Sequence, residues 1–410
     1  MRIFWRSVLT VLTGTALSQL IPIFGALLLA RLYAPSEFGT FSAWLGFVLI
    51  IAVFLTARYE TVLPNLKDGA EREGPVLLIL STGVLIAAIS WLTIGAIVIS
   101  WPTVFQDATK ELYFLAIPAA LCVSISLLWQ TWAAAAGKYR ILSLMRVYQA
   151  AGITVTQIAL GFLHPNATSL GVAYLIGSSI GVLASFKLMP IRVLSLKEIM
   201  CDLPNFWMRH RRFPIYSLPA SAINTAAAQL PVIVITSRFG PEVGGLLAMS
   251  MRILGAPIGL LGKSVQDVFK RQAATAVRER GECRKEYVNT LMVLSSASIA
   301  FVILMAIYSE DLFSLAFGDQ WREAGTISIW LLPLFAMRFI ASPLSYVVYV
   351  VEKQHVDLIW QMGLMLMTLA TLYWGSAHDV ALKSYSVGYA ALYVVYLIMS
   401  YRFSLGARFK

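Results

Sequence analysis

Three arginines lie within long apolar stretches of the sequence, at Arg58, Arg252 and Arg338. A charged side chain in hydrocarbon is costly and normally faces a cavity or a partner. The planar guanidinium group offers a fork of donors that can bind two phosphate oxygens at once. We therefore expect these arginines to make a cavity positive enough to bind an anionic substrate. In the competing interpretation they pair with Glu60 or with backbone carbonyls, or extend to a membrane interface.

Polar and helix-bending residues accompany these cations. Glu60 lies two residues after Arg58, so on one helix the two side chains would point to different faces and would not form a simple pair. The other candidates for a polar cavity or for gating lie in the first apolar segment of each half, at Gln19, Asn224, Gln229, Pro22, Pro219 and Pro231. Contact between helices is the competing role for the amides, and a static kink for the prolines.

Aromatic residues also follow a helical spacing near the end of the chain, at Tyr385, Tyr389, Tyr393 and Tyr396. Aromatic faces can stack on sugars, but such a stripe more often packs against a neighbouring helix. Earlier in the chain, Trp129 and Trp132 are expected to anchor a helix at a membrane interface.

The composition indicates that these residues are positioned by membrane-spanning helices. Of the 410 residues, 59% are hydrophobic and only 13% are charged, whereas soluble domains have about 25% charged residues. Lipid-exposed backbone must satisfy its own hydrogen bonds, so helices are expected. Twelve apolar segments are long enough to span a bilayer, at approximately residues 7–30, 40–62, 75–99, 112–134, 143–162, 168–187, 213–236, 243–263, 288–308, 324–350, 355–374 and 380–402.

The formal net charge of +11 follows the loops between these segments. With the N-terminus inside, 24 of the 32 lysines and arginines fall on the inner side and five on the outer side, and three lie within spans. This asymmetry predicts that both termini are cytoplasmic. The charges do not cluster on a soluble face, so nucleic acid is not an expected partner.

The two halves of the chain share a motif. Residues 31–39, RLYAPSEFG, recur in part as residues 238–244, RFGPEVG, about half the chain away. Six spans in each half give both halves the same orientation, which predicts two parallel repeats. We expect an N-terminal six-helix bundle at 1–187, a cytoplasmic linker at 188–212 and a C-terminal six-helix bundle at 213–410. The linker mixes apolar and basic residues, which suits an interfacial helix on an anionic leaflet or a solvated basic connector.

Several short motifs in both halves carry a resemblance to a known family. They are residues 12–15 (LTGT), 31–39, 58–64 (RYETVLP), 237–240 (SRFG), 251–257 (MRILGAP) and 268–269 (VF). In combination they resemble the polysaccharide biosynthesis family of Wzx-type O-antigen flippases, in the exporter superfamily that also holds multidrug extruders and the lipid II flippase. The resemblance implies two six-helix bundles around a central cavity, working by alternating access in the bacterial inner membrane.

The same resemblance implies the substrate, an oligosaccharide repeat unit linked to undecaprenyl diphosphate and destined for O-antigen, capsule or exopolysaccharide. The expected partners are this lipid-linked oligosaccharide and membrane lipids, with polysaccharide polymerase and chain-length machinery as candidates. The alternative is an ion-coupled multidrug or small-molecule exporter of the same superfamily, which would need buried carboxylates. An enzyme is not expected because the outer loops are short. No cofactor or metal site is expected, because Cys122, Cys201 and Cys283 are far apart.

Overall fold

The computed structural model describes residues 2–67, 69–100, 110–188, 196–350 and 353–406. Every regular element in these ranges is a helix. The first half contains α1 (Arg2–Leu32), α2 (Pro35–Leu55), η1 (Tyr59–Asn65), α3 (Ala70–Ser100), α4 (Lys110–Ala135), α5 (Tyr139–Leu163), α6 (Ala167–Leu188), α7 (Leu196–Arg209) and η2 (Phe213–Ser217). The second half contains α8 (Leu218–Phe239), α9 (Pro241–Pro257), η3 (Ile258–Gly262), α10 (Lys263–Arg280), α11 (Arg284–Phe317), η4 (Asp319–Trp321), α12 (Arg322–Leu344), α13 (Val347–Val350), α14 (Gln354–Trp374) and α15 (His378–Ser404).

Each of the twelve expected spans falls largely on one long helix, with or without its helical continuation. The exception in extent is the span at 40–62, because α2 ends at Leu55 and a turn at residues 56–58 separates it from η1. Eight helical segments within the described ranges are both long and apolar enough to cross a membrane. They correspond to α2, α3, α4, α6, α8 with η2, α11, α12 with η4, and α15. The other four expected spans correspond to α1, α5, α9 with η3, and α14. The chain is therefore an all-α, polytopic membrane protein.

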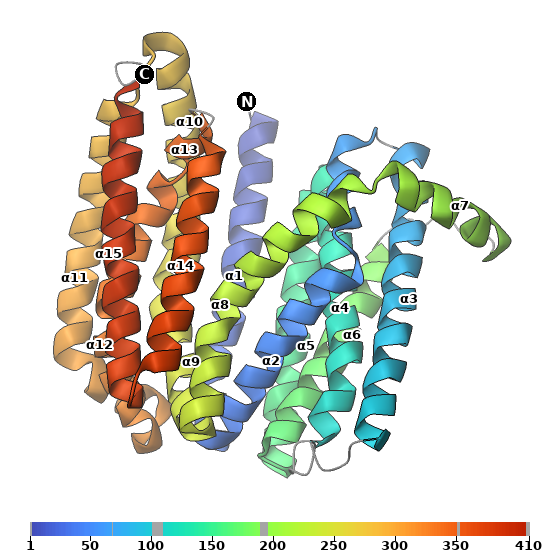
Figure 1. Ribbon diagram of the computed structural model, residues 1–410, viewed down its shortest axis with the longest axis horizontal. Coiled ribbons are helices and arrows are strands. Elements are labelled where there is room, and N and C mark those ends of the chain that lie inside the picture. The colour runs from blue at the N-terminus through green and yellow to red at the C-terminus, as the bar shows by residue number, and fades with distance from the viewer. Residues whose placement is uncertain (1, 68, 101–109, 189–195, 351–352, 407–410) are drawn as a thin grey trace. The chain divides into compact units, whose positions relative to one another are not determined.

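The chain forms two compact units, Met1–Ile233 and Val234–Lys410. In the first unit, α4 is the central helix and packs against α2, α3 and α6. Helix α5 lies along α6 and α1. Figure 1 shows these helices of the first unit side by side, with α3 at the outer edge of that unit.

The second unit repeats this arrangement. Here α12 is central and packs against α9, α11 and α15, and α14 lies along α15. The pairs α2–α4, α3–α4, α4–α6 and α5–α6 of the first unit thus correspond to α9–α12, α11–α12, α12–α15 and α14–α15 of the second. The internal repeat that the shared motif predicts is therefore visible in four helix pairs, whereas, in the described part of the chain, the extensive contact of α1 with α5 has no counterpart of similar extent between α8 and α14.

The shared motif starts the second long helix of each repeat and ties down other helix ends. Pro35 and Pro241 occupy the first positions of α2 and α9, where the missing N–H costs nothing. In the first unit, the Glu37 carboxylate accepts a 2.6 Å hydrogen bond from the N–H of Ala167 at the start of α6. In the second unit, the Arg238 guanidinium donates to the carbonyls of Leu372 and Gly375 at the end of α14. Both contacts place the favoured charge at a helix end.

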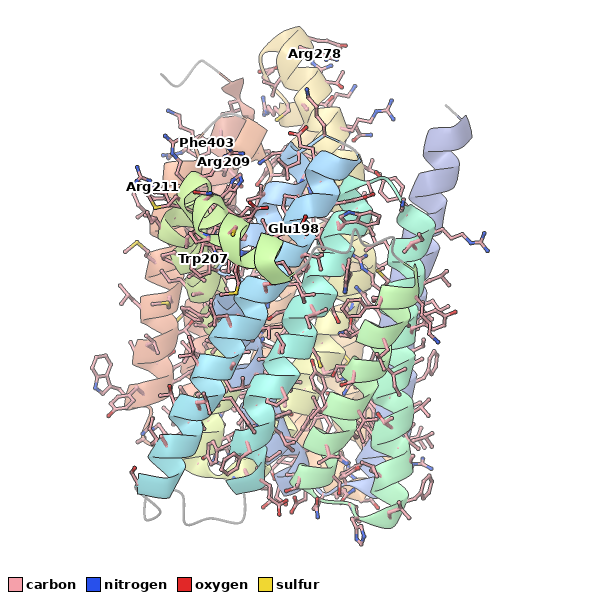
Figure 2. The ribbon with its side chains drawn as sticks, turned by 90° about the vertical axis from the view of Figure 1, so that its right-hand side faces the viewer. Glu198, Trp207, Arg209, Arg211, Arg278 and Phe403 are labelled. Atoms are coloured by element: carbon pink, nitrogen blue, oxygen red, sulfur yellow. The ribbon has the colours of Figure 1, made fainter. Side chains whose placement is uncertain are left out.

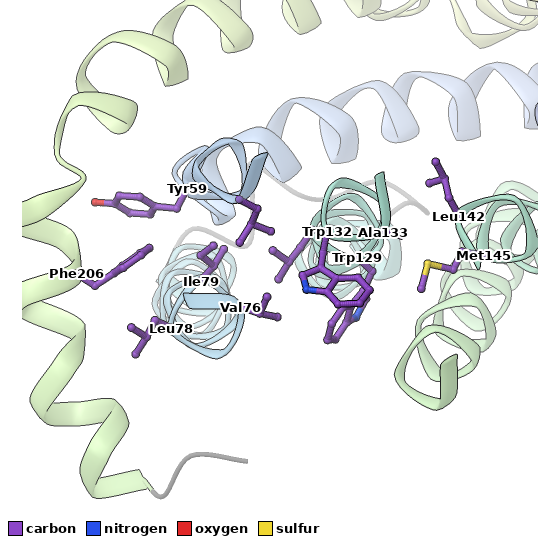
Figure 3. Packing of buried hydrophobic residues seen from close by; sticks show 12 residues of the cluster. Tyr59, Val76, Leu78, Ile79, Trp129, Trp132, Ala133, Leu142, Met145 and Phe206 are labelled. Carbon is purple, nitrogen blue, oxygen red and sulfur yellow. The ribbon is translucent and has the colours of Figure 1, made fainter. Parts of the chain in front are cut away.

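The core of the first unit contains the two tryptophans that the sequence places at an interface. Trp129 and Trp132 are 1% and 3% exposed and pack among Val76, Ile79 and Leu142 (Figure 3). The interface prediction is therefore wrong, because α4 is surrounded by other helices and its aromatic residues fill the space between them.

The described part of the linker forms the amphipathic helix α7, whereas residues 189–195 of the predicted linker lie outside the described residues. Helix α7 runs across α3 (Figure 2). Phe206 is buried against Tyr59, with ring centroids 5.2 Å apart, and the Trp207 indole N–H donates to the Thr82 hydroxyl at 2.9 Å. Part of the apolar face of the linker is thus covered by the first unit itself, while Met200 and Met208 remain exposed.

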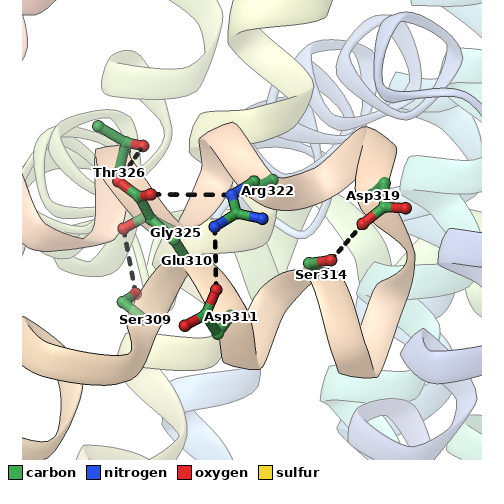
Figure 4. Close-up of polar contacts among 8 residues, drawn as sticks. All are labelled: Ser309, Glu310, Asp311, Ser314, Asp319, Arg322, Gly325 and Thr326. Carbon is green, nitrogen blue, oxygen red and sulfur yellow. Dashed lines mark hydrogen bonds and ion pairs between the residues drawn. The ribbon is translucent and has the colours of Figure 1, made fainter.

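The longest expected outer loop, Ser309 to Glu323, is itself mostly helical. Helix α11 continues to Phe317, and η4 leads directly into α12. Figure 4 shows the polar contacts that join the two helices there: Arg322 pairs with Asp311 at 3.0 Å, and the Thr326 hydroxyl donates to Glu310. The side chains of Arg322 and Asp311 are 56% and 71% exposed, so these contacts define a tight helical turn more than a folded outer domain.

Candidate functional site

Arg58 and Glu60 form an ion pair in the first unit. The Arg58 Nη1 and Glu60 Oε1 atoms are 2.9 Å apart, and the side chains are 24% and 1% exposed. The expectation that the two point to different faces is wrong, because they do not lie on one α-helix. Helix α2 ends at Leu55, and Ala57 and Arg58 adopt left-handed conformations before η1 begins at Tyr59.

Arg72 holds η1 in place. The sequence places this arginine among the charges of a predicted inner loop, and that position does not indicate such a role. Arg72 is 6% exposed, and its guanidinium donates to the carbonyls of Leu63, Leu66 and Ala135. The first two carbonyls lie in or just after η1, and the third lies at the end of α4. Because three carbonyls from these two segments converge on one cation, η1 is fixed against the start of α3 and the end of α4.

Arg252 lies on α9 and is half-buried in the second unit. Its neighbours in sequence, Met249, Ser250 and Leu254, are buried, and the Ser250 hydroxyl donates to the carbonyl of Ala324 on α12 at 2.7 Å. The opposite edge of α9 thus packs on the central helix of the unit. Arg252 is within the helical part of its predicted span, as expected.

Arg338 lies on α12 beside the tyrosine stripe of α15. Its guanidinium group lies close enough to Tyr385, Tyr389 and Tyr393 to interact with them electrostatically. The tyrosine rings stack in sequence along α15, with centroids 5.5 Å and 5.1 Å apart. Tyr385 and Tyr393 are 3% and 8% exposed, so the stripe is mainly a packing surface, the competing interpretation given above. The phenol groups nevertheless give Arg338 a polar environment within the unit.

The remaining candidates occupy more ordinary positions. Helix α1 continues through Pro22, and Gln19 is half-buried one turn before it. Pro219 lies where η2 passes directly into α8, and α8 continues through the buried Pro231. Asn224 is exposed.

Gln229 packs on α2 within the first unit. A methyl group on Gly46 would lie 3.4 Å from the Gln229 Cβ atom and 3.1 Å from Ile233. The absence of a side chain at Gly46 thus lets the first part of α8 approach α2 closely, and this contact favours a packing role for Gln229.

A second buried carboxylate, Asp357 on α14, escaped the sequence analysis. It is 7% exposed and accepts hydrogen bonds from the Tyr396 hydroxyl at 2.9 Å and the Gln361 amide at 2.7 Å. The indole ring of Trp360 packs against Tyr396 with centroids 4.6 Å apart. The signal was present in the sequence, since Gln361 follows Asp357 by one helical turn and both lie within an expected span.

Another arginine, Arg146, lies inside a helix of the first unit. Arg146, which the topology count assigned to a loop, is on the second turn of α5 and half-buried. Its Nε donates to the side-chain oxygen of Gln130 on α4 at 3.1 Å, and Gln130 in turn contacts Gln149. This polar group joins α4 to α5 near the same end of the unit as η1, because Ala135, at the end of α4, also contacts Arg72.

The structure therefore places the charged candidates in two groups. Arg58 and Glu60 are together in the first unit, and Arg252 and Arg338 lie on packed helices of the second. Within the described residues, no group of three or more His, Cys, Asp or Glu residues could hold a metal ion.

Comparison with known proteins supplies a family and a fold. The sequence matches the family model described as "Polysaccharide biosynthesis protein" over residues 28–326. Among curated proteins, no sequence relative is found.

Two solved transporter structures share the fold over most of their length. The chain is similar to a lipid II flippase, MurJ, in an inward closed conformation, with a TM-score of 0.72 and 14% identity over 95% of this chain and 87% of that one. It is also similar to an inward-facing multidrug resistance MATE family transporter of the MOP superfamily, with a TM-score of 0.69 and 12% identity over 94% of both chains.

Proposed function

Since the chain belongs to the polysaccharide biosynthesis protein family, we propose that it is a flippase for lipid-linked oligosaccharides. In this proposal it moves undecaprenyl-diphosphate-linked repeat units from the cytoplasmic to the periplasmic leaflet by alternating access. The product would serve the synthesis of O-antigen, capsule or exopolysaccharide. The fold shared with a lipid II flippase supports this proposal at the level of architecture.

The observation that carries the proposal is the placement of arginines on apolar, membrane-spanning helices. A sugar diphosphate cannot cross hydrocarbon unless polar groups replace its water. Arg58, Arg252 and Arg338 all lie at or inside such helices, and each unit contributes at least one. Arginine suits this task because it stays charged when buried and binds phosphate with two donors at once. The polyprenyl tail needs no such site, because it can remain in lipid.

The proposal includes a topology and partners. We place the protein in the bacterial inner membrane with both termini in the cytoplasm, as the loop charges predict. The functional repeats would be residues 1–187 and 213–410, joined by the linker at 188–212. Polysaccharide polymerase and chain-length machinery would receive the flipped product. The role proposed is transport, with no catalytic step assigned.

The test is a strain that lacks this gene, assayed for surface polysaccharide and for lipid-linked repeat units together. We expect long-chain polysaccharide to be lost and repeat units to accumulate on the cytoplasmic leaflet. Normal polysaccharide without accumulation, in a strain with no second flippase, would contradict the proposal.

One observation favours a second candidate, an ion-coupled exporter of small molecules. Buried carboxylates are the usual sites of ion coupling in transporters, and Asp357 joins Glu60 as a buried acid. In that case Asp357→Asn should abolish gradient-driven export of cationic dyes from cells. A flippase that uses Asp357 only to energise lipid transport would export no dye in either form.

A further inference from the structure

The ion pair between Arg58 and Glu60 is incomplete on both sides. A single contact joins Nη1 to Oε1 at 2.9 Å. The Glu60 Oε2 and Arg58 Nε atoms are both buried and have no hydrogen-bond partner among the described residues. Buried polar atoms nearly always have a hydrogen-bond partner. A buried donor and a buried acceptor that both lack one, within a single ion pair, therefore call for an explanation. Arginine–carboxylate pairs are frequently bidentate, whereas this pair uses one nitrogen and one oxygen.

The backbone holds the pair in this geometry. Ala57 and Arg58 have φ angles of 48° and 63°, a conformation that costs non-glycine residues about 1 kcal/mol or more each. The Thr61 hydroxyl donates to the Arg58 carbonyl at 2.6 Å, and the contacts of Arg72 fix η1 just beyond. The strained turn is therefore held by its surroundings.

The chemistry of the unused atoms describes a ligand. An arginine whose N–H groups are only partly used can donate hydrogen bonds to a phosphate oxygen in place of a carboxylate oxygen. A carboxylate released from the arginine accepts hydrogen bonds from hydroxyl groups. A ligand that carries an anionic oxygen next to hydroxyls would satisfy both sides, and the sugar–phosphate end of a lipid-linked oligosaccharide has this pattern. The Arg58 side chain retains 24% exposure, so it is not fully enclosed by the protein.

We propose that Glu60 is a built-in competitor for the anionic group of the substrate. In the empty protein its carboxylate occupies Arg58, and in the loaded protein a phosphate oxygen takes that place while Glu60 turns to the hydroxyls of the ligand. This inference rests on the proposed function, because it takes the substrate to be a lipid-linked sugar diphosphate. The competition keeps Arg58 neutralised when no substrate is present, and it lowers affinity so that the substrate can be released after transport.

The test is the binding of undecaprenyl diphosphate to the full-length protein in phosphatidylcholine nanodiscs. Glu60→Gln removes the competing charge and should raise affinity about tenfold, the scale of one charge-assisted hydrogen bond. Arg58→Gln should weaken binding, and the double variant should bind as weakly as Arg58→Gln alone. Glu310→Gln is the matched control, because Glu310 also contacts an arginine, Arg322, but at an exposed site in the second unit. Its affinity should equal that of the wild type.

Unchanged or weaker binding by folded Glu60→Gln protein would overturn the inference and leave the proposed function intact. If Glu60→Gln does not fold, Glu60→Asp keeps the charge but shortens its reach, and it must raise affinity by a smaller factor for the inference to hold. If the wild type and every variant fail to bind the diphosphate, the proposed function and this inference fall together.

Discussion

Buried cations in this chain are held in different ways, and the difference separates structural roles from candidate binding roles. Arg72 donates to three backbone carbonyls, so its contacts within the first unit account for its buried charge. Among the residues that the structure describes, Arg58 has one contact with a carboxylate, and its Nε has no hydrogen-bond partner. Arg338 faces phenol groups, which are weak partners for a full positive charge. The less completely an arginine is matched by its own protein, the more it has to offer an anionic ligand.

We expect Arg252→Ala and Arg338→Ala to reduce transport of lipid-linked repeat units about tenfold or more, because each removes a charged donor from a site shielded from water. Lysine at either position should restore part of the activity, since it keeps the charge but not the two-donor fork. The measurement is long-chain polysaccharide in a complemented deletion strain, with protein level checked by immunoblot.

Arg322→Ala is the control for charge removal alone, because Arg322 is 56% exposed at the surface of the second unit. It should leave transport unchanged. Normal transport by both alanine variants of Arg252 and Arg338 would exclude these two arginines from substrate binding.

At the scale of elements, the first unit depends on very close contact between α5 and α6. A methyl group on Gly177 would lie 2.4 Å from the Ile153 Cα atom and 2.6 Å from the Gly152 carbonyl carbon. These are backbone atoms, which cannot move aside as the end of a flexible side chain could. Small residues at such crossings let membrane helices approach and gain van der Waals contact.

Gly177→Ala should therefore lower the free energy of unfolding by about 1–3 kcal/mol, the usual cost of overpacking. Thermal unfolding of the detergent-purified protein measures this loss. Gly95→Ala on α3 is the matched control, because nothing lies within 4 Å of the added methyl group. Equal unfolding temperatures for the two variants would mean that α5 and α6 separate easily.

The docking of α7 should depend on pH through His210. Its ring lies between Phe206 and Phe213, with centroids 4.9 Å and 6.3 Å away. Burial, and then the charge of Arg209, lower the pKa of His210 below its ordinary value. Because docking lowers this pKa, helix α7 docks more tightly when the His210 imidazole is neutral than when it is protonated. Docking is therefore strongest above the free pKa of about 6.5 and weakens as the pH falls through it toward the lower docked value.

Hydrogen exchange of the α7 amides, corrected for intrinsic rates, measures this effect. Protection should be lower at pH 5.5 than at pH 7.5 in the wild type. His210→Gln cannot titrate and should show no such difference. Protection that stays constant or rises in acid in the wild type would show that His210 does not control docking.

At the scale of the whole molecule, hydrophobic length predicted where the long apolar helices lie, because each must cover the same thickness of hydrocarbon. The repeat was predictable because its motif starts a helix, and proline at that position leaves a sequence trace. Side-chain partners were less predictable. The pairing of Arg58 with Glu60 depends on a left-handed turn at two non-glycine residues, which no local pattern indicates. The burial of Trp129 and Asp357 depends on which helices surround them, and the helical spacing of apolar residues does not determine these neighbours.

The predicted topology can be tested with the cysteines that the chain already has. Cys201 is exposed on α7, whereas Cys122 is half-buried within α4. Cys283 is buried, and burial raises the pKa of its thiol to about 11, so it is protonated and unreactive at neutral pH. A membrane-impermeant maleimide should therefore label Cys201 in inside-out vesicles but not in intact spheroplasts, and Cys201→Ser should remove the label.

The reciprocal probe is Glu323→Cys in the Cys201→Ser background. Glu323 is exposed at the start of α12, in the loop predicted to face outward, so this variant should be labelled in spheroplasts. Labelling of both positions from one side would mean that the chain crosses the membrane an even number of times between α7 and α12. The predicted topology has three crossings there, so this result would contradict the parallel repeat. Labelling of Cys201 from outside and of Glu323→Cys from inside would keep the repeat but invert the protein, against the 24-to-five distribution of basic residues. Opposite labelling in the predicted sense is the result that a parallel pair of six-helix repeats with a cytoplasmic linker requires.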